Sequence, residues 1–181
     1  NVWLGYILMP VAQFNLGYLK YARDSPEMSS YIEQLDEVMK IAVSNPGLIW
    51  LHEDNTINEV YRIFGRKDNP AANLSTWTSV DCLHRFMISE MHRAVMNRRD
   101  EWFKSCTEET FVMWYISKDY RPTIKEAYDR LKYLNTYGQT EFAFNDLIKY
   151  PEIEPLVEQI GQLHEINKNC ILVTSGIDGG L

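Results

Sequence analysis

Two histidines and two arginines lie in one stretch of helical periodicity, and their side chains could carry proton transfer and anion binding. The stretch runs from about 79 to 104 and opens with TSVD, which resembles a capping box. At about 100° per residue, its apolar residues form one predicted core-facing stripe: Leu83, Met87, Met91, Val95 and Trp102. His84 and Arg98 fall within this stripe, whereas His92 and Arg99 fall at its far edge.

His84 is the first candidate for acid–base chemistry, because histidine exchanges protons near neutral pH. The alternative is a core histidine bonded to a backbone carbonyl. Arg98 would need a partner if it faced the core, since a buried guanidinium is costly unless paired. A substrate oxyanion could be that partner, or Arg98 could run its stem over Trp102 and reach solvent. We take His84, His92 and Arg98 as candidate catalytic residues and Trp102 as a candidate binding residue.

Polar side chains share one face in each of two predicted strands: Gln13 and Asn15 in MPVAQFNL (9–16), and Asn73 and Ser75 with Trp77 in NLSTWTS (73–79). Buried amides need hydrogen-bond partners, and a ligand could be one. Water or a partner protomer could satisfy them equally well. Asn15 is therefore a further candidate catalytic residue, and Asn73, Ser75 and Trp77 are candidate substrate-binding residues.

The remaining elements complete an α+β pattern. A helix begins at the cap and first turn of DSPEM and stops at NPG (45–47), and LIWLHE (48–53) is a second strand that carries Trp50 and His52, two further binding candidates. Residues 54–71 predict a long irregular connection, and TFVMWYIS (110–117) predicts a fourth strand. The order βαββαβ indicates a ferredoxin-like sandwich.

Additional elements follow the sandwich. TIKE (123–126) predicts a capping box for a third long helix that Gly138 can end, and EFAFN predicts a short extra strand. The composition changes near Pro151. We therefore expect one domain over residues 1–149, followed by a C-terminal helix and flexible tail over 150–181.

Composition limits the possible partners. The chain has 181 residues and a net charge of −7, which disfavours unselective nucleic-acid binding. The apolar opening VWLGYILMPVA is too short to span a bilayer and lacks a basic leader. Three widely spaced cysteines without a CxxC disfavour a disulfide framework or a zinc site. These features predict a cytoplasmic protein that binds neither nucleic acid nor membrane.

The aromatic content favours a hydrophobic ligand. The sequence holds five Trp, eleven Tyr and seven Phe; some form the core, and a cavity lined by the rest would suit a flat apolar molecule. There is no GxGxxG, P-loop or GxSxG, so nucleotide cofactors and serine-hydrolase chemistry have no motif support. No two histidines are spaced for a shared helical metal site, so no metal is expected.

Seven segments, taken together and in order, resemble an uncharacterised family within the dimeric α+β barrel superfamily: AQFNL, DSPEM, NPGLIW, NLSTWTS, HRAVMNRRDEWF, RPTIKEAYDRL and YGQTEFAF. That superfamily includes antibiotic-biosynthesis monooxygenases, haem-degrading monooxygenases and some polyketide cyclases. The resemblance covers about residues 9–145. It implies two ferredoxin-like protomers whose sheets pair into a barrel, with a cavity between sheet and helices in each. It also implies that Asn15 and Trp77 face that cavity.

The leading functional hypothesis is a small enzyme without a nucleotide cofactor that acts on a hydrophobic, oxygenated, natural-product-like molecule. Monooxygenation is the favoured reaction, and cyclisation or isomerisation by proton transfer is the alternative. A haem protein with His84 or His92 as axial ligand and a non-catalytic ligand-binding dimer are also open. We expect a homodimer, because the sheet face away from the helices would otherwise expose many apolar residues.

Overall fold

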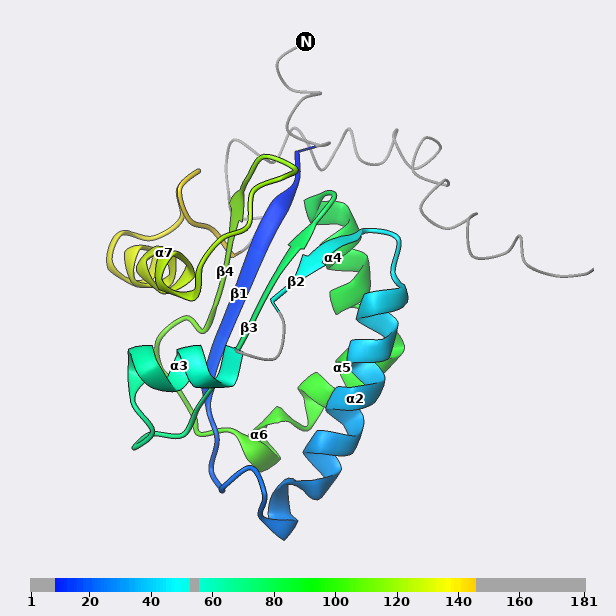
Figure 1. Cartoon of the computed structure of the whole chain (residues 1–181), viewed down its shortest axis with the longest axis vertical. Coiled ribbons are helices and arrows are strands. Elements are labelled where there is room, and N and C mark those ends of the chain that lie inside the picture. The colour runs from blue at the N-terminus through cyan, green and yellow to red at the C-terminus, as the bar shows by residue number, and fades with distance from the viewer. Residues whose placement is uncertain (1–8, 53–55, 146–181) are drawn as a thin grey trace, which may run out of the picture.

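One four-stranded sheet organises the chain. The computed structural model describes residues 9–52 and 56–145. The strands are β1 (Val11–Tyr18), β2 (Leu48–Leu51), β3 (Pro70–Trp77) and β4 (Phe111–Tyr115). They pair antiparallel in the order β2-β3-β1-β4, with the two crossover connections of a ferredoxin-like sandwich (Figure 1). The predicted α+β class and βαββαβ order are confirmed, and the strands lie within about three residues of their expected ends.

The register of the two central strands decides which side chains share a face. Val11 pairs with Trp77, and Asn15 pairs with Asn73. Because side chains alternate across a strand, these residues and Gln13 point to one face. Phe14 and the alternate residues on either side of it, Ala12 and Leu16, point to the other face.

The first face is covered by both crossovers, which curve along one side of the sheet (Figure 1). The first crossover is the short turn η1 (Pro26–Met28) and helix α2 (Ser29–Ser44), as expected from DSPEM and NPG. The second contains α4 (Val80–Met87), α5 (Glu90–Asn97) and α6 (Arg99–Trp102). The prediction of one continuous helix over 79–104 is wrong.

The interruptions of the second crossover have local causes. Ser79 caps α4 by accepting from the Cys82 amide, so the cap stands one residue after the predicted one. Ser89 precedes α5 in an extended conformation, and Glu90 follows it in the first turn, where an acidic side chain suits the helix dipole. Arg98 ends α5 and precedes α6 with a non-helical backbone. Each interruption rotates the next helix relative to a continuous one.

The second face of the sheet is covered by α3 (Thr56–Phe64) and α7 (Ile124–Tyr137). They bury an apolar cluster against the strands: Ala12, Phe14, Leu16, Val60, Leu74, Val112, Trp114, Ile116, Ile124, Ala127, Leu131, Leu134 and Ala143. The helix α3 corrects the predicted irregular connection over 54–71. The start of α7 is confirmed, because Thr123 caps it by accepting from the Glu126 amide and Gly138 follows its end.

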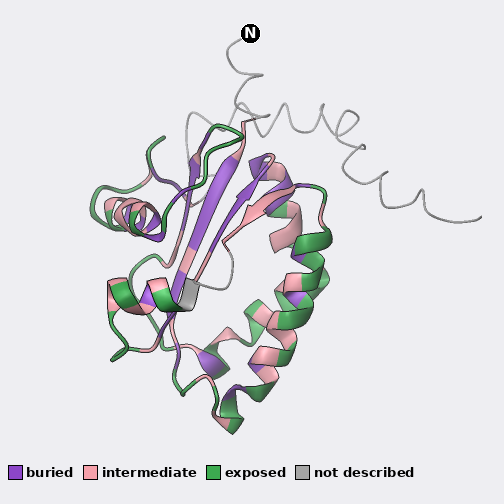
Figure 2. Cartoon of the chain, in the orientation of Figure 1, coloured by how far each residue is buried: buried purple, intermediate pink, exposed green. Residues whose placement is uncertain are grey.

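This coverage removes the reason given for a homodimer. The face expected to be exposed is filled by α3 and α7, and most of the central strand β1 is coloured as buried (Figure 2). Dimerisation therefore stays a prediction, and it no longer follows from an uncovered sheet.

The outer edge of β4 meets a returning segment instead of a fifth strand. Met113 and Phe144 form an isolated antiparallel bridge, with Met113 N donating to Phe144 O at 2.6 Å. Thr140 and Ala143 bridge in the same segment. The strand predicted for EFAFN is thus only a pair of bridges. The predicted boundary at 149 and the C-terminal helix and tail lie outside the described residues. Among the helices of the described ranges, none is long and apolar enough to cross a membrane.

The role of α7 can be tested by truncating its buried side. Leu131 is 4% exposed within the second-face cluster, so Leu131→Ala should lower the free energy of unfolding by about 2–5 kcal/mol in urea titrations. Its neighbour Lys132 is exposed, and Lys132→Ala should change it by less than about 1 kcal/mol. Equal effects would show that α7 does not pack on the sheet.

Candidate active site

A row of polar side chains runs along the middle of the first sheet face. Gln13 Nε2 donates to Asn73 Oδ1 at 2.5 Å and to Ser75 Oγ at 2.7 Å. Trp77 Nε1 donates to the same Ser75 oxygen at 2.9 Å. Ser75 is only 2% exposed, so its oxygen is well suited to satisfy two neighbouring donors inside the fold.

The row keeps unused hydrogen-bonding capacity. Among the described residues, the Ser75 hydroxyl proton has no acceptor and Gln13 Oε1 accepts no hydrogen bond. The side-chain amide of Asn15, opposite Asn73, makes no hydrogen bond within these residues either. A donor hydroxyl and acceptor amides therefore stand side by side, which is the pattern that an oxygenated ligand could complete.

Solvent reaches this row from the helix side. Asn15 and Asn73 lie on the two central strands, so other strands cover their edges, and both side chains point to the first face. Both are nevertheless partly exposed. Their neighbours Gln13, Ser75 and Trp77 in the same row are buried. The middle of the first face is therefore partly exposed to solvent, and we call this region, between the sheet and the covering helices, the cleft.

An aromatic chain leads from the row to His92. Trp77 stacks on Phe86 of α4 with ring centroids 5.0 Å apart, and Phe86 lies 5.1 Å from the His92 ring of α5. Trp77 is 1% exposed, while Phe86 and His92 are partly exposed. The predicted residues Trp77 and His92 thus lie at the same end of the cleft.

The hydrogen bond of His92 defines its tautomer. Nδ1 lies 2.9 Å from the Met87 carbonyl oxygen. Since α4 ends at Met87, that carbonyl lies past the helical ladder and is open to a side-chain donor. A carbonyl can only accept, so Nδ1 carries the proton of the neutral ring and Nε2 presents a lone pair. Burial lowers the pKa of His92 below its ordinary value of 6.5, against the smaller raising effect of the Met87 carbonyl.

The arginine that approaches the sheet is Arg99. A Cβ added at Gly17 would lie 2.7 Å from Phe103 Cδ1 and 3.4 Å from an Arg99 guanidinium nitrogen, so both side chains lie over this glycine. Gly17 follows Asn15 by two residues and therefore continues the same face. Arg99 also lies 5.1 Å from the Phe103 ring centroid and forms no ion pair or hydrogen bond with a described residue.

Arg98, by contrast, points to solvent. Its side chain is 43% exposed, and its guanidinium donates two hydrogen bonds of 2.8 Å to the Glu101 carboxylate. It also lies over the Trp102 ring, 4.8 Å from the centroid. The expectation of an inward Arg98 is wrong, and the alternative of a stem covering Trp102 describes its position. Because the helix is interrupted at Arg98, the side chain of the following residue, Arg99, points toward the sheet instead.

The placement of His84 is likewise corrected. Cys82 and Leu83 define the buried side of α4, and His84 follows about 100° further round and is exposed. Trp102 is 2% exposed and belongs to a core cluster with Tyr31, and its Nε1 donates to Ser30 Oγ at 3.2 Å. Neither His84 nor Trp102 joins the polar row.

Trp50 and His52 lie on the opposite side of the sheet. Trp50 pairs with Thr76, whose side chain points toward the second face, and it packs against the cluster under α3 and α7. His52 Nε2 lies 3.0 Å from a Glu59 carboxylate oxygen on α3. These two binding candidates are thus separated by the sheet from Asn15 and Ser75.

Three residues of the cleft were not among the predicted candidates: Gln13, Phe86 and Arg99. Alternation in β1 places Gln13 on the face of Asn15, so the sequence contained its signal. Phe86 lies off the apolar stripe of a continuous helix, and Arg99 lies at that stripe's edge. Phe86 lies within α4 and stacks on Trp77 from there, whereas the interruption at Arg98 brings Arg99 to the sheet.

The part of the chain that the structure describes offers no group of three or more His, Cys, Asp or Glu side chains that could hold a metal ion. The free Nε2 of His92 is the one histidine nitrogen in the cleft to which a planar cofactor could be ligated, with Nδ1 already oriented by a carbonyl.

Sequence comparison identifies a family over most of the chain. Residues 10–155 match the family model described as Domain of unknown function (DUF3291). No curated protein shows significant sequence similarity to this chain.

Solved structures with a similar arrangement have low sequence identity. SnoaB of Streptomyces nogalater, described as a cofactor-independent oxygenase, is 15% identical with a TM-score of 0.40, covering 65% of this chain and 99% of SnoaB. A conserved Methanosarcina mazei Go1 protein is 9% identical with a TM-score of 0.43, covering 61% and 96%. A Caulobacter crescentus CB15 protein, described provisionally as an antibiotic biosynthesis monooxygenase, is 12% identical with a TM-score of 0.40, covering 63% and 93%. These similarities are too distant to transfer a reaction.

Ser75→Ala should test the polar row. The substitution leaves the Trp77 indole N–H and one Gln13 proton without their acceptor inside the fold. We expect a loss of about 1–3 kcal/mol in the free energy of unfolding, measured by urea titration. Ser105→Ala, at an exposed serine, should change it by less than about 0.5 kcal/mol. A silent Ser75→Ala would contradict the network.

The lowered pKa of His92 predicts a pH-dependent stability. The unfolded chain binds a proton at His92 more readily than the folded chain, because its pKa returns to about 6.5. The contribution of His92 to the free energy of unfolding is therefore fully present above that pH. It decreases as the pH falls toward the lower pKa of the folded state. Unfolding free energies measured from about pH 7 downward should fall more steeply for the parent than for His92→Gln. Parallel curves would show that His92 is not buried.

Proposed function

The chain belongs to the family described as Domain of unknown function (DUF3291), and from the geometry of its cleft we propose that it is a monooxygenase-like enzyme of small hydrophobic, oxygenated molecules. The proposal needs no nucleotide cofactor, because the substrate itself supplies the electrons. The observation that carries it is the neutral, Nδ1-anchored ring of His92 at the end of an aromatic chain that leads to the polar row.

His92 is the proposed general base. Its Nε2 lone pair is available because Nδ1 donates to the Met87 carbonyl, and its lowered pKa keeps the ring neutral near neutral pH. The neighbouring Phe86 and Trp77 rings form an apolar wall on which a flat substrate can lie. A base held against aromatic rings suits the removal of a proton from a phenol.

The polar row and Arg99 are the proposed binding groups. Asn15 and Gln13 offer amides with free hydrogen-bonding capacity to substrate hydroxyl and carbonyl groups. Arg99, over Gly17 at the other end of the same face, is partly buried and has no ion pair among the described residues. It supplies the positive charge that would bind an anionic oxygen of the substrate at that end, the role first expected of Arg98.

The atoms and electrons of the proposed reaction balance without an added reductant. Deprotonation of a phenol conjugated to an activated methylene raises the electron density of that carbon, which reacts with molecular oxygen. The methylene and one O₂ become a carbonyl and one water, so the carbon loses the electrons that oxygen gains. His92 holds the first proton and returns it to the leaving water. Proton transfer without oxygen in the same cleft would instead give isomerisation or cyclisation.

Oxygen uptake with a hydroxylated tricyclic methylene ketone such as dithranol tests the proposal. The parent should consume oxygen and form the quinone, and His92→Gln should be slower by about 10²–10⁴-fold. His84→Gln removes an exposed histidine of the same crossover and should leave the rate unchanged. Arg99→Lys and Arg98→Lys form a second matched pair, in which only the first should reduce turnover.

The outcomes separate the alternatives. Isomerised product without oxygen uptake would favour proton-transfer chemistry at the same base. An intense Soret absorption in the purified protein that disappears in His92→Gln would favour a haem protein with His92 as ligand. Equal rates for His92→Gln and His84→Gln would exclude His92 as the base.

A further inference from the structure

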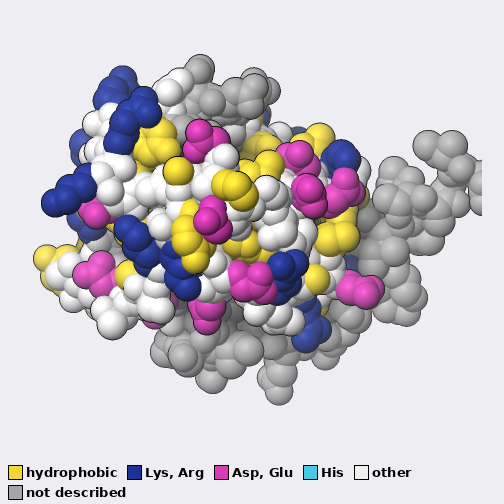
Figure 3. All heavy atoms as spheres, turned by 90° about the horizontal axis from the view of Figure 1, so that it is seen from below, with side chains coloured by type: hydrophobic (Ala, Val, Ile, Leu, Met, Phe, Trp, Pro, Cys, Tyr) yellow, Lys and Arg dark blue, Asp and Glu magenta, His cyan; other side chains and the backbone are white. Residues whose placement is uncertain are grey.

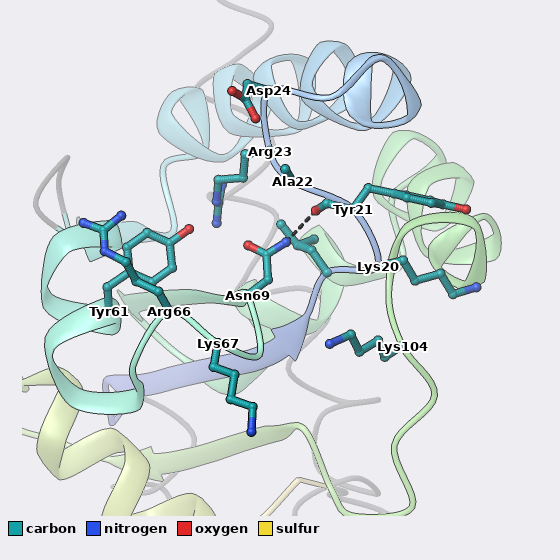
Figure 4. A pocket seen from close by; sticks show the side chains of 11 residues that line it. Lys20, Tyr21, Ala22, Arg23, Asp24, Tyr61, Arg66, Lys67, Asn69 and Lys104 are labelled. Atoms are coloured by element: carbon teal, nitrogen blue, oxygen red, sulfur yellow. Dashed lines mark hydrogen bonds between the residues drawn. The ribbon is translucent and has the colours of Figure 1, made fainter.

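A second, quite different pocket lies at the end of the sheet where β1 finishes. Its walls are the segment after β1, the connection from α3 to β3, and the chain that follows α6 (Figure 4). It encloses about 470 Å³ and is open to solvent. This volume lies within the usual range of small-molecule sites. The cleft residues of the proposed active site are not part of its lining.

Backbone pairing holds the walls of this pocket together. Leu19 N donates to Asn69 O at 2.9 Å, and Lys20 N donates to the Trp102 carbonyl at 2.8 Å. Asn69 has a φ of +52°, a left-handed conformation that asparagine tolerates better than most residues. Its side-chain amide donates to the Tyr21 carbonyl, as the dashed line in Figure 4 marks. The connection before β3 is thus tied to the segment after β1.

The charge of the lining is opposite to that of the protein. Five cationic side chains surround the pocket, and one acid accompanies them: Lys20, Arg23, Arg66, Lys67 and Lys104, with Asp24. The whole chain carries a net charge of −7. Viewed from below, Lys and Arg side chains gather toward the left of this face, and acidic ones are more frequent toward the right (Figure 3). Such local concentration of one sign attracts the opposite charge.

None of these five cations forms an ion pair within residues 9–52 and 56–145. Lys20 Nζ donates to the Asp100 backbone carbonyl, and Lys104 Nζ lies 3.4 Å from the Asp68 carbonyl. Arg66 lies over the Tyr61 ring, 4.5 Å from the centroid. These partners are neutral, so they leave the positive charge uncompensated.

Other basic residues show how this chain usually treats its cations. Lys40, Arg85, Lys125 and Arg130 all pair with a carboxylate within one helical turn. The pocket gathers unpaired cations from segments far apart in the sequence, and like charges held together repel each other. An arrangement of this kind is stable when an anion completes it.

Arg23 provides a second, independent indication. Its Nε is buried and has no hydrogen-bond partner. A buried donor without an acceptor is rare in folded proteins and costs stability. Figure 4 shows the Arg23 side chain extending toward the space between Tyr61 and Asn69, while the carboxylate of Asp24 points away from it. An oxyanion in that space would accept from Arg23.

We propose that this pocket binds a phosphate group, either free or as a phosphate ester. A doubly charged phosphate matches several cations, whereas a single carboxylate would leave most of them uncompensated. The planar guanidinium of Arg23 can donate in parallel to two phosphate oxygens, and the mobile ammonium groups of Lys67 and Lys104 add point charges. A long nucleic acid is disfavoured, because the net acidic surface beyond the pocket repels a polyanion.

Isothermal titration at low ionic strength, with inorganic phosphate and glucose 6-phosphate as separate probes, tests the proposal. We expect binding in the millimolar range or tighter that weakens with added salt. Arg23→Gln should weaken it by about tenfold or more. Lys67→Gln and Lys104→Gln should also weaken phosphate binding. Because both lysines are exposed, these variants keep the test valid if the Arg23 variant unfolds.

Lys118→Gln is the matched control, because Lys118 is an exposed lysine outside the pocket. It should leave phosphate binding unchanged. Tighter binding of glucose 6-phosphate than of inorganic phosphate identifies an ester as the ligand, and the reverse identifies free phosphate. The proposal is overturned by any of three results: no binding of either probe at millimolar concentration, equal weakening by Lys118→Gln, or tighter binding of oligothymidylate than of both probes.

Discussion

The pairing of β1 with β3 is the constraint on which the rest of the molecule depends. Its register places Gln13 opposite Ser75 and Asn15 opposite Asn73, so that the polar residues of both central strands meet on one face. A slip of one residue would turn Phe14 toward that row and the amides toward the apolar cluster under α3 and α7. Sheet order, core and cleft all follow from this one alignment.

The two faces of the sheet are completed in different ways. On the second face, α3 and α7 pack mainly apolar side chains against the strands and leave a closed core. On the first face, the helices pack at both ends, around Trp77 and around Trp102, and the middle keeps polar groups with unused hydrogen-bonding capacity. The polar groups that could bind a ligand are thus concentrated on the first face. The apolar core of the second face contributes stability that offsets the partly exposed polar groups of the first.

The sequence predicted the strands and their order well, because alternation and helix caps are local signals. The prediction failed where the helical periodicity of one element was extended into the next element. Treating 79–104 as continuous placed His84 and Arg98 inward, although no Gly or Pro marks the interruptions near Ser89 and Arg98. The prediction of a loop over 54–71 missed α3, although Val60, Ile63 and Phe64 recur in its sequence at helical spacing.

The basic pocket could not have been predicted from sequence at all. Its cations are separated by up to 84 residues, from Lys20 to Lys104, and no short pattern joins them. Only the convergence of three connections at the end of β1 assembles them. Conversely, the members of the polar row lie within two strands, so alternation alone found Asn15, Asn73 and Ser75 together.

The bridge between Met113 and Phe144 has a consequence for how this molecule behaves at high concentration. A sheet edge with free amide and carbonyl groups can recruit the edge of a second molecule and begin strand-by-strand growth. In β4, both backbone groups of Met113 are already engaged by Phe144, with N···O distances of 2.6 and 3.0 Å. The middle of this five-residue edge strand is therefore blocked, which makes β4 a poor template for aggregation.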